Sequence, residues 1–223
     1  MIDRLPRWVW IGAWLLAVIA GMVNVVGLLG FEHQAITHLT GTTTMLGASL
    51  ARADGVGFRH FALLILSFVA GAMISGFVVR DSTLRLGRRY GAALALESVL
   101  LASAAVLLSG ERELGHYLAS CACGLQNAMV STYSGATIRT THVSGMFTDL
   151  GIYVGHAVRG MRIDMRRLRL SVTVISGYLI GATAGALLFD VFHYATLYAP
   201  AALTGGVGLS YGLYSYYARR RGP

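Results

Sequence analysis

Two short segments of the chain carry the same run of hydroxyl, imidazole and glycine residues. Residues 37–47 align without a gap to residues 141–151, and six of the eleven positions are identical. Hydroxyl and imidazole groups donate and accept hydrogen bonds, and glycine lets a ligand or another backbone approach closely. This combination predicts binding of a small polar solute. The candidate substrate-binding residues in the two segments are Thr37, His38, Thr40, Gly41, Thr44, Thr141, His142, Ser144, Gly145 and Thr148.

The spacing of these residues places them on one stripe if each segment is a helix, because positions i, i+3, i+4 and i+7 share a face. A stripe of small residues also suits tight packing between membrane helices, which is the alternative to a solute site. Upstream, Asn24 and Asn127 occupy matching positions. We expect them to hydrogen-bond the chain that leads into each short helix, as further members of the site. Thr37 and Thr141 are expected to cap the two helix starts.

Two acidic residues within apolar segments are candidates for coupling solute movement to protons or cations. Asp149 lies seven residues after His142 on the same predicted helix face, and the first copy has Met45 in its place. Acidic residues at membrane depth are functional candidates by default. Asp149 is therefore the first coupling candidate and Glu97 the second. An ion pair between Asp149 and Arg139 is the structural alternative.

The sequence lacks the motifs of the common hydrolases, metalloproteases and nucleotide-binding proteins. The two cysteines, Cys121 and Cys123, lie in an apolar run, with no second cysteine pair to complete a zinc site. The loops between the apolar runs are too short for a separate catalytic domain. We therefore expect no enzyme activity, no cofactor and no bound metal.

The elements that must position these residues are membrane helices, as the composition indicates. Of the 223 residues, 55% are apolar and only 13% are charged, whereas a soluble domain carries about 25% charged residues. The net charge of +8 comes from arginines alone, with no lysine, and these cluster between apolar runs. Such charges set membrane topology. The expected partner is therefore a lipid bilayer and not nucleic acid.

Six apolar runs are each long enough to cross a bilayer. They cover residues 8–29, 61–79, 91–109, 116–133, 170–189 and 195–217, while the Thr/Gly-rich segments 37–50 and 141–158 are less apolar. If those two segments dip into the bilayer without crossing it, fifteen arginines lie inside and three outside; if they cross, the division is thirteen to five. The positive-inside rule favours the first arrangement. It predicts six spans, cytoplasmic termini, Arg85 and Arg162 inside, and Asp54 outside.

The repeated segments indicate that the chain is a duplication of two halves, residues 1–110 and residues 111–223. Each half holds three spans and one short helix, so the second half must enter the membrane upside down relative to the first. Inverted repeats of this kind form transporter sites where broken or re-entrant segments meet near the midplane. The seven residues before each motif, 30–36 and 134–140, are long enough to reach that depth when extended, at about 23 Å.

The same motifs resemble the YoaK family of bacterial inner-membrane proteins. The resemblance covers nearly the whole chain. It is carried by Thr37-His38-Leu39-Thr40-Gly41 with Thr44 and Gly47, by Gly124-Leu125-Gln126-Asn127, and by Arg139-Thr140-Thr141-His142-Val143-Ser144-Gly145 with Thr148-Asp149-Leu150-Gly151. It implies an integral membrane protein with six spans. Because that family is largely uncharacterised, it supplies no substrate.

Together these patterns predict an all-α integral membrane protein of the inner membrane, built as two inverted three-helix repeats. The predicted function is a small secondary transporter or permease for a small polar solute bound at the midplane between the two motifs. Helix N-termini that face one point would favour an anion. The alternatives are a non-transporting membrane partner or assembly protein, and a passive channel. Six spans make a slim unit, which favours a homodimer.

Overall fold

A computed structural model of the chain describes residues 7–30, 33, 35–79, 88–133 and 140–220, and within them all regular structure is helical. The predicted lead-in segments 30–36 and 134–140 lie partly, and Arg85 and Arg139 wholly, outside these residues, as do both chain ends. The elements are α1 (Arg7–Leu29), α2 (Leu39–Ala51), α3 (Gly55–Val78), α4 (Arg88–Ser109), α5 (Leu114–Tyr133), α6 (Val143–Val158), α7 (Met165–Phe192), the 3₁₀ helix η1 (His193–Leu197) and α8 (Tyr198–Arg220).

Four helical stretches within the described residues are long and apolar enough to cross a membrane. They are Val9–Leu29, Gly55–Val78, Tyr90–Ser109 and Met165–Tyr211, the last of which joins α7, η1 and part of α8. A bilayer core about 30 Å thick requires about 20 apolar residues in a helix. The fold is therefore that of an all-α membrane protein.

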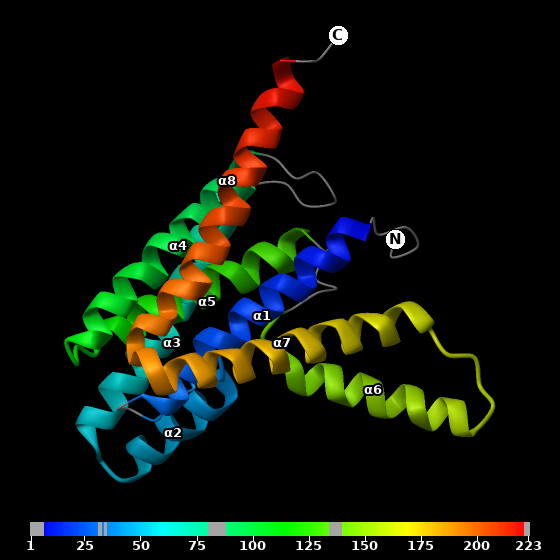
Figure 1. The fold of residues 1–223 in the computed structure, drawn as a ribbon. Coiled ribbons are helices and arrows are strands. Elements are labelled where there is room, and N and C mark those ends of the chain that lie inside the picture. Colours follow the sequence, from blue (N-terminus) through cyan, green and yellow to red (C-terminus); the bar gives the residue numbers. More distant parts are fainter. Residues whose placement is uncertain (1–6, 31–32, 34, 80–87, 134–139, 221–223) are drawn as a thin grey trace.

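The long helices pack mainly in three pairs, α1 with α7, α3 with α5, and α4 with α8 (Figure 1). Helix α4 also packs against α5, and α1 makes smaller contacts with α5 and α8, so the three pairs form one body. The two short helices fold back on the helices that follow them, α2 on α3 and α6 on α7, as Figure 1 shows. Each of the three pairs contains one helix from residues 1–110 and one from residues 111–223.

Glycine residues bring α1 and α7 into backbone contact. A Cβ atom at Gly181 of α7 would run into the carbonyl oxygen of Val18 on α1, and one at Gly21 of α1 would run into the carbonyl oxygen of Tyr178 on α7. Small residues that let backbones approach are the usual basis of close helix association in membranes. The two glycines therefore set the separation of this helix pair.

The pair formed by α3 and α5 repeats this arrangement. A Cβ atom at Gly71 of α3 would run into the carbonyl oxygen of Cys121 on α5, and one at Gly124 of α5 would run into that of Phe68 on α3. The sequence alignment that matches Gly21 to Gly124 also matches Val18 to Cys121, and Phe68 and Gly71 correspond to residues 178 and 181 of α7. Both interfaces are thus built from equivalent positions.

The helices that follow the short helices begin with the same type of cap. Asp54 accepts hydrogen bonds from the backbone N–H groups of Val56 (3.2 Å) and Gly57 (3.0 Å) at the start of α3. Asp164 does the same at the start of α7, with the N–H groups of Arg166 (3.1 Å) and Arg167 (3.3 Å). Aspartate is among the preferred N-cap residues, because its carboxylate satisfies N–H groups that have no partner within the helix. These caps fix where each short helix turns back.

Candidate functional site

A partly buried hydrogen-bond cluster joins α1, the segment before α2, and α7. The side-chain oxygen of Asn24 accepts hydrogen bonds from the backbone N–H and the hydroxyl of Thr37, both at 2.8 Å. The Thr37 hydroxyl also lies 3.3 Å from the hydroxyl of Tyr178. Asn24 lies five residues before the end of α1, or about 7.5 Å along the helix axis. The chain therefore returns along α1 before α2 begins, and Asn24 holds it there.

The capping role expected for Thr37 is wrong, because its hydroxyl bonds Asn24 instead of the helix start. Helix α2 begins at Leu39, and its N-cap is His38, whose side chain makes no capping hydrogen bond. Helix α6 likewise begins at Val143 after an N-cap at His142 that makes no side-chain capping bond. The geometry thus uses Thr37 to position the chain relative to α1 and α7.

In the second half, the segment before α6 is held by a threonine and a side-chain amide, each one position before the residue that the sequence predicted. The hydroxyl of Thr140, which is fully buried, donates to the side-chain oxygen of Gln126 at 3.5 Å, and the Gln126 amide donates to the carbonyl oxygen of Leu16 at 3.3 Å. The side-chain oxygen of Asn127 is buried without a hydrogen-bond partner among the described residues. Thr141, the predicted member, is only partly buried. Gln126 belongs to the matched tetrapeptide Gly124–Asn127. The alignment pointed to Asn127, whereas the structure uses Gln126.

The stripe residues of the two short helices lie mostly on exposed surface. Thr44 and Thr148 donate their hydroxyls to the carbonyl oxygens of Thr40 (2.9 Å) and Ser144 (3.0 Å) on their own helices. The exposed members of the two motifs are His38, Thr40, Thr44, His142, Ser144 and Thr148. The hydroxyls of Thr44 and Thr148 therefore satisfy the backbone of their own helices, and all six side chains lie on the surface.

The repeated spacing of histidine and glycine has a local structural explanation. A Cβ atom at Gly41 would meet the His38 ring, and one at Gly145 would run into the His142 ring. Each glycine therefore leaves room for the imidazole three residues before it. The short helices α2 and α6 do not contact each other in the described part of the chain. Each of them folds back on a different helix pair, α2 on α3 and α6 on α7.

Of the two coupling candidates, only Glu97 lies in the core. Its side chain, on α4, is 2% exposed, and its Oε2 atom has no hydrogen-bond partner among the described residues. Cys123 on α5, the helix that packs against α4, is also buried. The next residue, Ser98, donates to the carbonyl oxygen of Ala201 at 2.7 Å and ties α4 to α8. Asp149 is partly exposed on α6.

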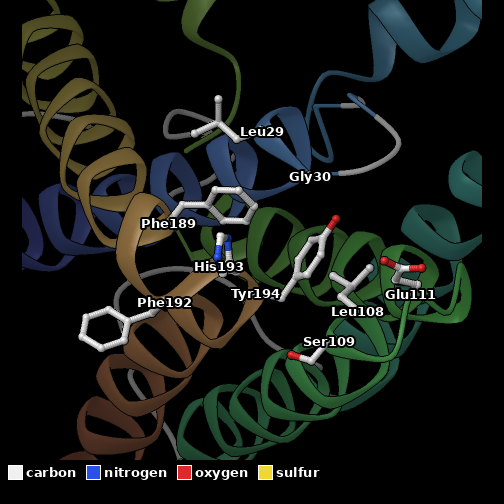
Figure 2. Close-up of a pocket in the computed structure, with 9 residues that line it drawn as sticks. All are labelled: Leu29, Gly30, Leu108, Ser109, Glu111, Phe189, Phe192, His193 and Tyr194. Carbon is white, nitrogen blue, oxygen red and sulfur yellow. The ribbon is translucent and has the colours of Figure 1, made fainter.

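A pocket of about 550 Å³ opens where α1, α4 and α7 end (Figure 2). Its walls include three aromatic residues of α7 and η1, and the Phe189 ring makes edge contacts with the rings of His193 (5.8 Å between centroids) and Tyr194 (5.5 Å). The lining residues are Leu29, Gly30, Leu108, Ser109, Glu111, Phe189, Phe192, His193 and Tyr194. The sequence did not predict this pocket, because its walls come from segments about 80 residues apart.

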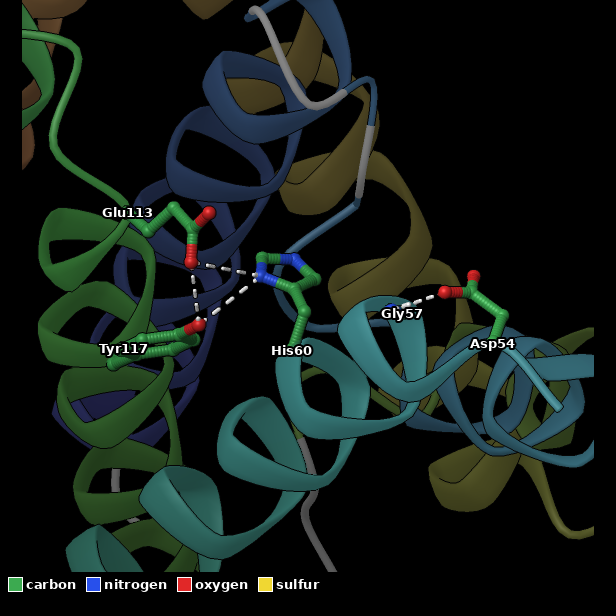
Figure 3. Close-up of polar contacts among 5 residues, drawn as sticks. All are labelled: Asp54, Gly57, His60, Glu113 and Tyr117. Carbon is green, nitrogen blue, oxygen red and sulfur yellow. Dashed lines mark hydrogen bonds and ion pairs between the residues drawn. The ribbon is translucent and has the colours of Figure 1, made fainter. Parts of the chain in front are cut away.

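A second polar cluster that the sequence did not reveal lies where α3 and α5 begin (Figure 3). The Nδ1 atom of His60 is 3.1 Å from the Tyr117 hydroxyl and 3.8 Å from the Oε2 atom of Glu113, to which Tyr117 donates at 3.0 Å. The His116 ring lies 6.3 Å from the His60 ring. The predicted spans 61–79 and 116–133 begin on the same side of the membrane in the six-span topology. This could have indicated that the residues at their starts lie close together.

Among the described residues, no three His, Cys, Asp or Glu side chains are grouped closely enough to hold a metal ion.

Comparisons with known proteins agree with one another. The family model described as "Protein of unknown function (DUF1275)" matches residues 12–210. The UPF0700 transmembrane protein YoaK of Bacillus subtilis (strain 168) is 24% identical over 201 residues, which cover 86% of this chain and 89% of that protein. No solved structure matches the chain.

Proposed function

We propose that this chain, which belongs to the DUF1275 family of proteins of unknown function, is a small secondary transporter or permease for a small polar solute. Its apolar helices make it a membrane protein, and its similarity to the transmembrane protein YoaK agrees with this. The proposal places it in the cytoplasmic membrane, with six spans and both termini on the cytoplasmic side. It includes no catalytic step.

The pairing of the long helices supports an inverted-repeat transporter. Helix α1 packs on α7 and its sequence equivalent α5 packs on α3, through glycines at matching positions. With three spans in each half, equivalent helices cross the membrane in opposite directions. Secondary transporters are commonly built from repeats related in this way, with polar sites between the halves.

The observation that carries the proposal is Glu97, a buried carboxyl group whose Oε2 atom has no partner among the described residues. A carboxylate at membrane depth is costly unless a partner, an ion or water accompanies it, and such residues mark substrate or ion pathways. Glu97 lies on α4, which packs against α5, and the side chain of Cys123 on α5 is also buried. Glu97 therefore belongs to the buried interior of the protein, as Thr37 does.

The solute site that we propose is accordingly centred on Asn24, Thr37 and Tyr178, with Glu97 as the coupling group. The motif residues on the outer faces of α2 and α6 would then position the two short helices. Motion of α2 would move Thr37 relative to α7, because the segment before α2 is bonded to Asn24 and lies beside Tyr178. This supplies a route by which a solute could break and replace one set of hydrogen bonds.

Replacing Thr37 with valine is expected to weaken solute binding about tenfold, because one buried hydroxyl hydrogen bond is lost while the side-chain volume is kept. Purified protein is first screened by thermal denaturation against small polar anions, zwitterions and neutral solutes, since a ligand of the folded state raises the melting temperature. The hit is then titrated against the variant. The matched control is Thr44→Val, whose hydroxyl bonds only its own helix.

Two outcomes of this screen would contradict the proposal. Absence of any stabilising solute would remove the transporter function, and equal binding by both valine variants would remove the Thr37 site. Accumulation of the hit solute against its gradient in proteoliposomes separates a transporter from a passive channel, which only equilibrates it.

The turns after α2 and α6 are expected to face opposite sides of the membrane. Because Asp54 caps α3, the label is placed beside it at exposed Arg52, and at exposed Arg162 in the other half. Single cysteines at these positions, with Cys121 and Cys123 changed to alanine, are exposed to an impermeant thiol reagent on whole cells. Labelling is expected at position 52 only. Labelling at both positions or at neither would sink the inverted six-span arrangement and favour eight spans.

The outer faces of α2 and α6 favour a second candidate function, that of a membrane partner or assembly protein. Both faces combine hydroxyl residues with exposed apolar residues, among them Met45 and Leu50 on α2 and Phe147 and Ile152 on α6. In a homodimer, a second copy would cover one of these faces. The mass of the protein in detergent distinguishes a homodimer from a monomer, and a stable monomer would exclude a second copy as the occupant of these faces.

A further inference from the structure

We propose that the pocket at the ends of α1, α4 and α7 binds an organic cation, namely an ammonium group attached to an apolar or aromatic body. Its volume of about 550 Å³ falls within the range of small-molecule sites. The pocket shares no lining residue with the Asn24, Thr37 and Tyr178 cluster. The inference therefore stands apart from the transport proposal and can be tested without transport.

The electrostatic surroundings of the pocket favour positive charge. Three helices end at its wall, α1 at Leu29, α4 at Ser109 and α7 at Phe192. Helix C-termini carry the negative end of the helix dipole, so three of them in one place attract a cation. Glu111 adds a carboxylate, and the nine lining residues include no arginine or lysine.

The apolar wall of the pocket suits the body of such a ligand and also its charged end. Phe189 and Tyr194 meet edge to face, at 84° between their planes, and Figure 2 shows their rings beside His193 in the pocket wall. Aromatic faces attract ammonium groups through their negative quadrupole. A small anion would meet no arginine or lysine side chain among the lining residues.

Local backbone features hold these walls in place. Glu111 (φ 53°) and His193 (φ 49°) both adopt the left-handed conformation, which costs free energy for residues other than glycine and is often found at functional sites. At Gly30, a side chain would run into the Tyr194 ring. The glycine thus lets the tyrosine close one wall of the pocket against the end of α1.

The test compares three ligands of nearly one shape that differ in charge: benzylammonium, benzyl alcohol and benzoate. Binding to the purified full-length protein in detergent is measured by isothermal titration calorimetry. Benzylammonium is expected to bind at least tenfold more tightly than the other two. The Glu111→Gln variant is expected to lose about tenfold in benzylammonium affinity, the scale of one charge-assisted hydrogen bond.

The control is Asp190→Asn, which removes an exposed carboxylate of α7 that does not line the pocket, and it is expected to leave the affinity unchanged. Equal binding of the three ligands would mean an apolar pocket without charge selectivity and would overturn the proposal. So would the absence of benzylammonium binding, or full affinity in Glu111→Gln. Should that variant misfold, Glu111→Asn replaces it, because asparagine tolerates a positive φ.

Discussion

Replacing Gly71 with alanine is expected to destabilise the protein by about 3 kcal/mol, the upper part of the usual range for overpacking in a close-packed interior. The added methyl group would run into the Cys121 carbonyl, which belongs to a helix backbone and has no rotamer by which to move away. Either α3 and α5 separate or the helix distorts. At 2–4 °C per kcal/mol, the melting temperature should fall by roughly 6–12 °C.

The measurement is thermal denaturation of the purified protein in detergent, with Gly76→Ala as the matched control. Gly76 lies on the same helix, and nothing stands within 4 Å of a Cβ atom there. Because alanine is the better helix former by about 1 kcal/mol, this control is expected to be neutral or slightly stabilising. Gly181→Ala, at the equivalent position on α7, should behave like Gly71→Ala. Equal melting temperatures for the Gly71 and Gly76 variants would contradict the packing described for α3 and α5.

Replacing Glu97 with glutamine is expected to abolish accumulation of the solute against its gradient while leaving the fold intact. Glutamine keeps the shape of the side chain but cannot take up and release a proton, so coupling should fail whereas exchange of solute across the membrane should persist. The measurement is gradient-driven uptake and counterflow in proteoliposomes, with the solute identified by the stability screen. Retained pH-dependent accumulation would exclude Glu97 as the coupling group.

Asp149→Asn serves as the comparison, since the sequence pointed to Asp149 before Glu97. Asp149 is partly exposed on α6, where water or lipid headgroups can partner a carboxylate, so we expect a smaller loss there. Exposed Asp190, changed to asparagine, is the neutral control. A complete loss in Asp149→Asn with normal accumulation in Glu97→Gln would restore the order that the sequence suggested.

Much of the helical architecture could be predicted from local patterns. Long apolar runs identified the helices, and the matched motifs identified the YoaK-like family, which the comparisons confirm. The contact between Asn24 and the segment before α2 was predictable because only 13 residues separate Asn24 from Thr37. Such local contacts follow from residue type and spacing.

The candidate site was harder to predict because it depends on which helices pair. Tyr178 reaches Thr37 across 141 residues of sequence, and this follows from the packing of α1 on α7. His60 and Tyr117 likewise meet only because α3 packs on α5. The packing of α2 on α3 and of α6 on α7 likewise depends on the arrangement of the long helices.

The pairing of α1 with α7 has a consequence for biogenesis. Helix α1 enters the membrane early in synthesis, yet its partner is complete only when the ribosome has reached Phe192, roughly 10–30 s later at 5–20 residues per second. During that interval the glycine face of α1 has no helix against which to close. During synthesis α1 must therefore stay beside the insertion machinery or alone in lipid. Chains truncated before α7 are accordingly expected to be degraded rapidly in cells, because α1 then lacks its partner helix.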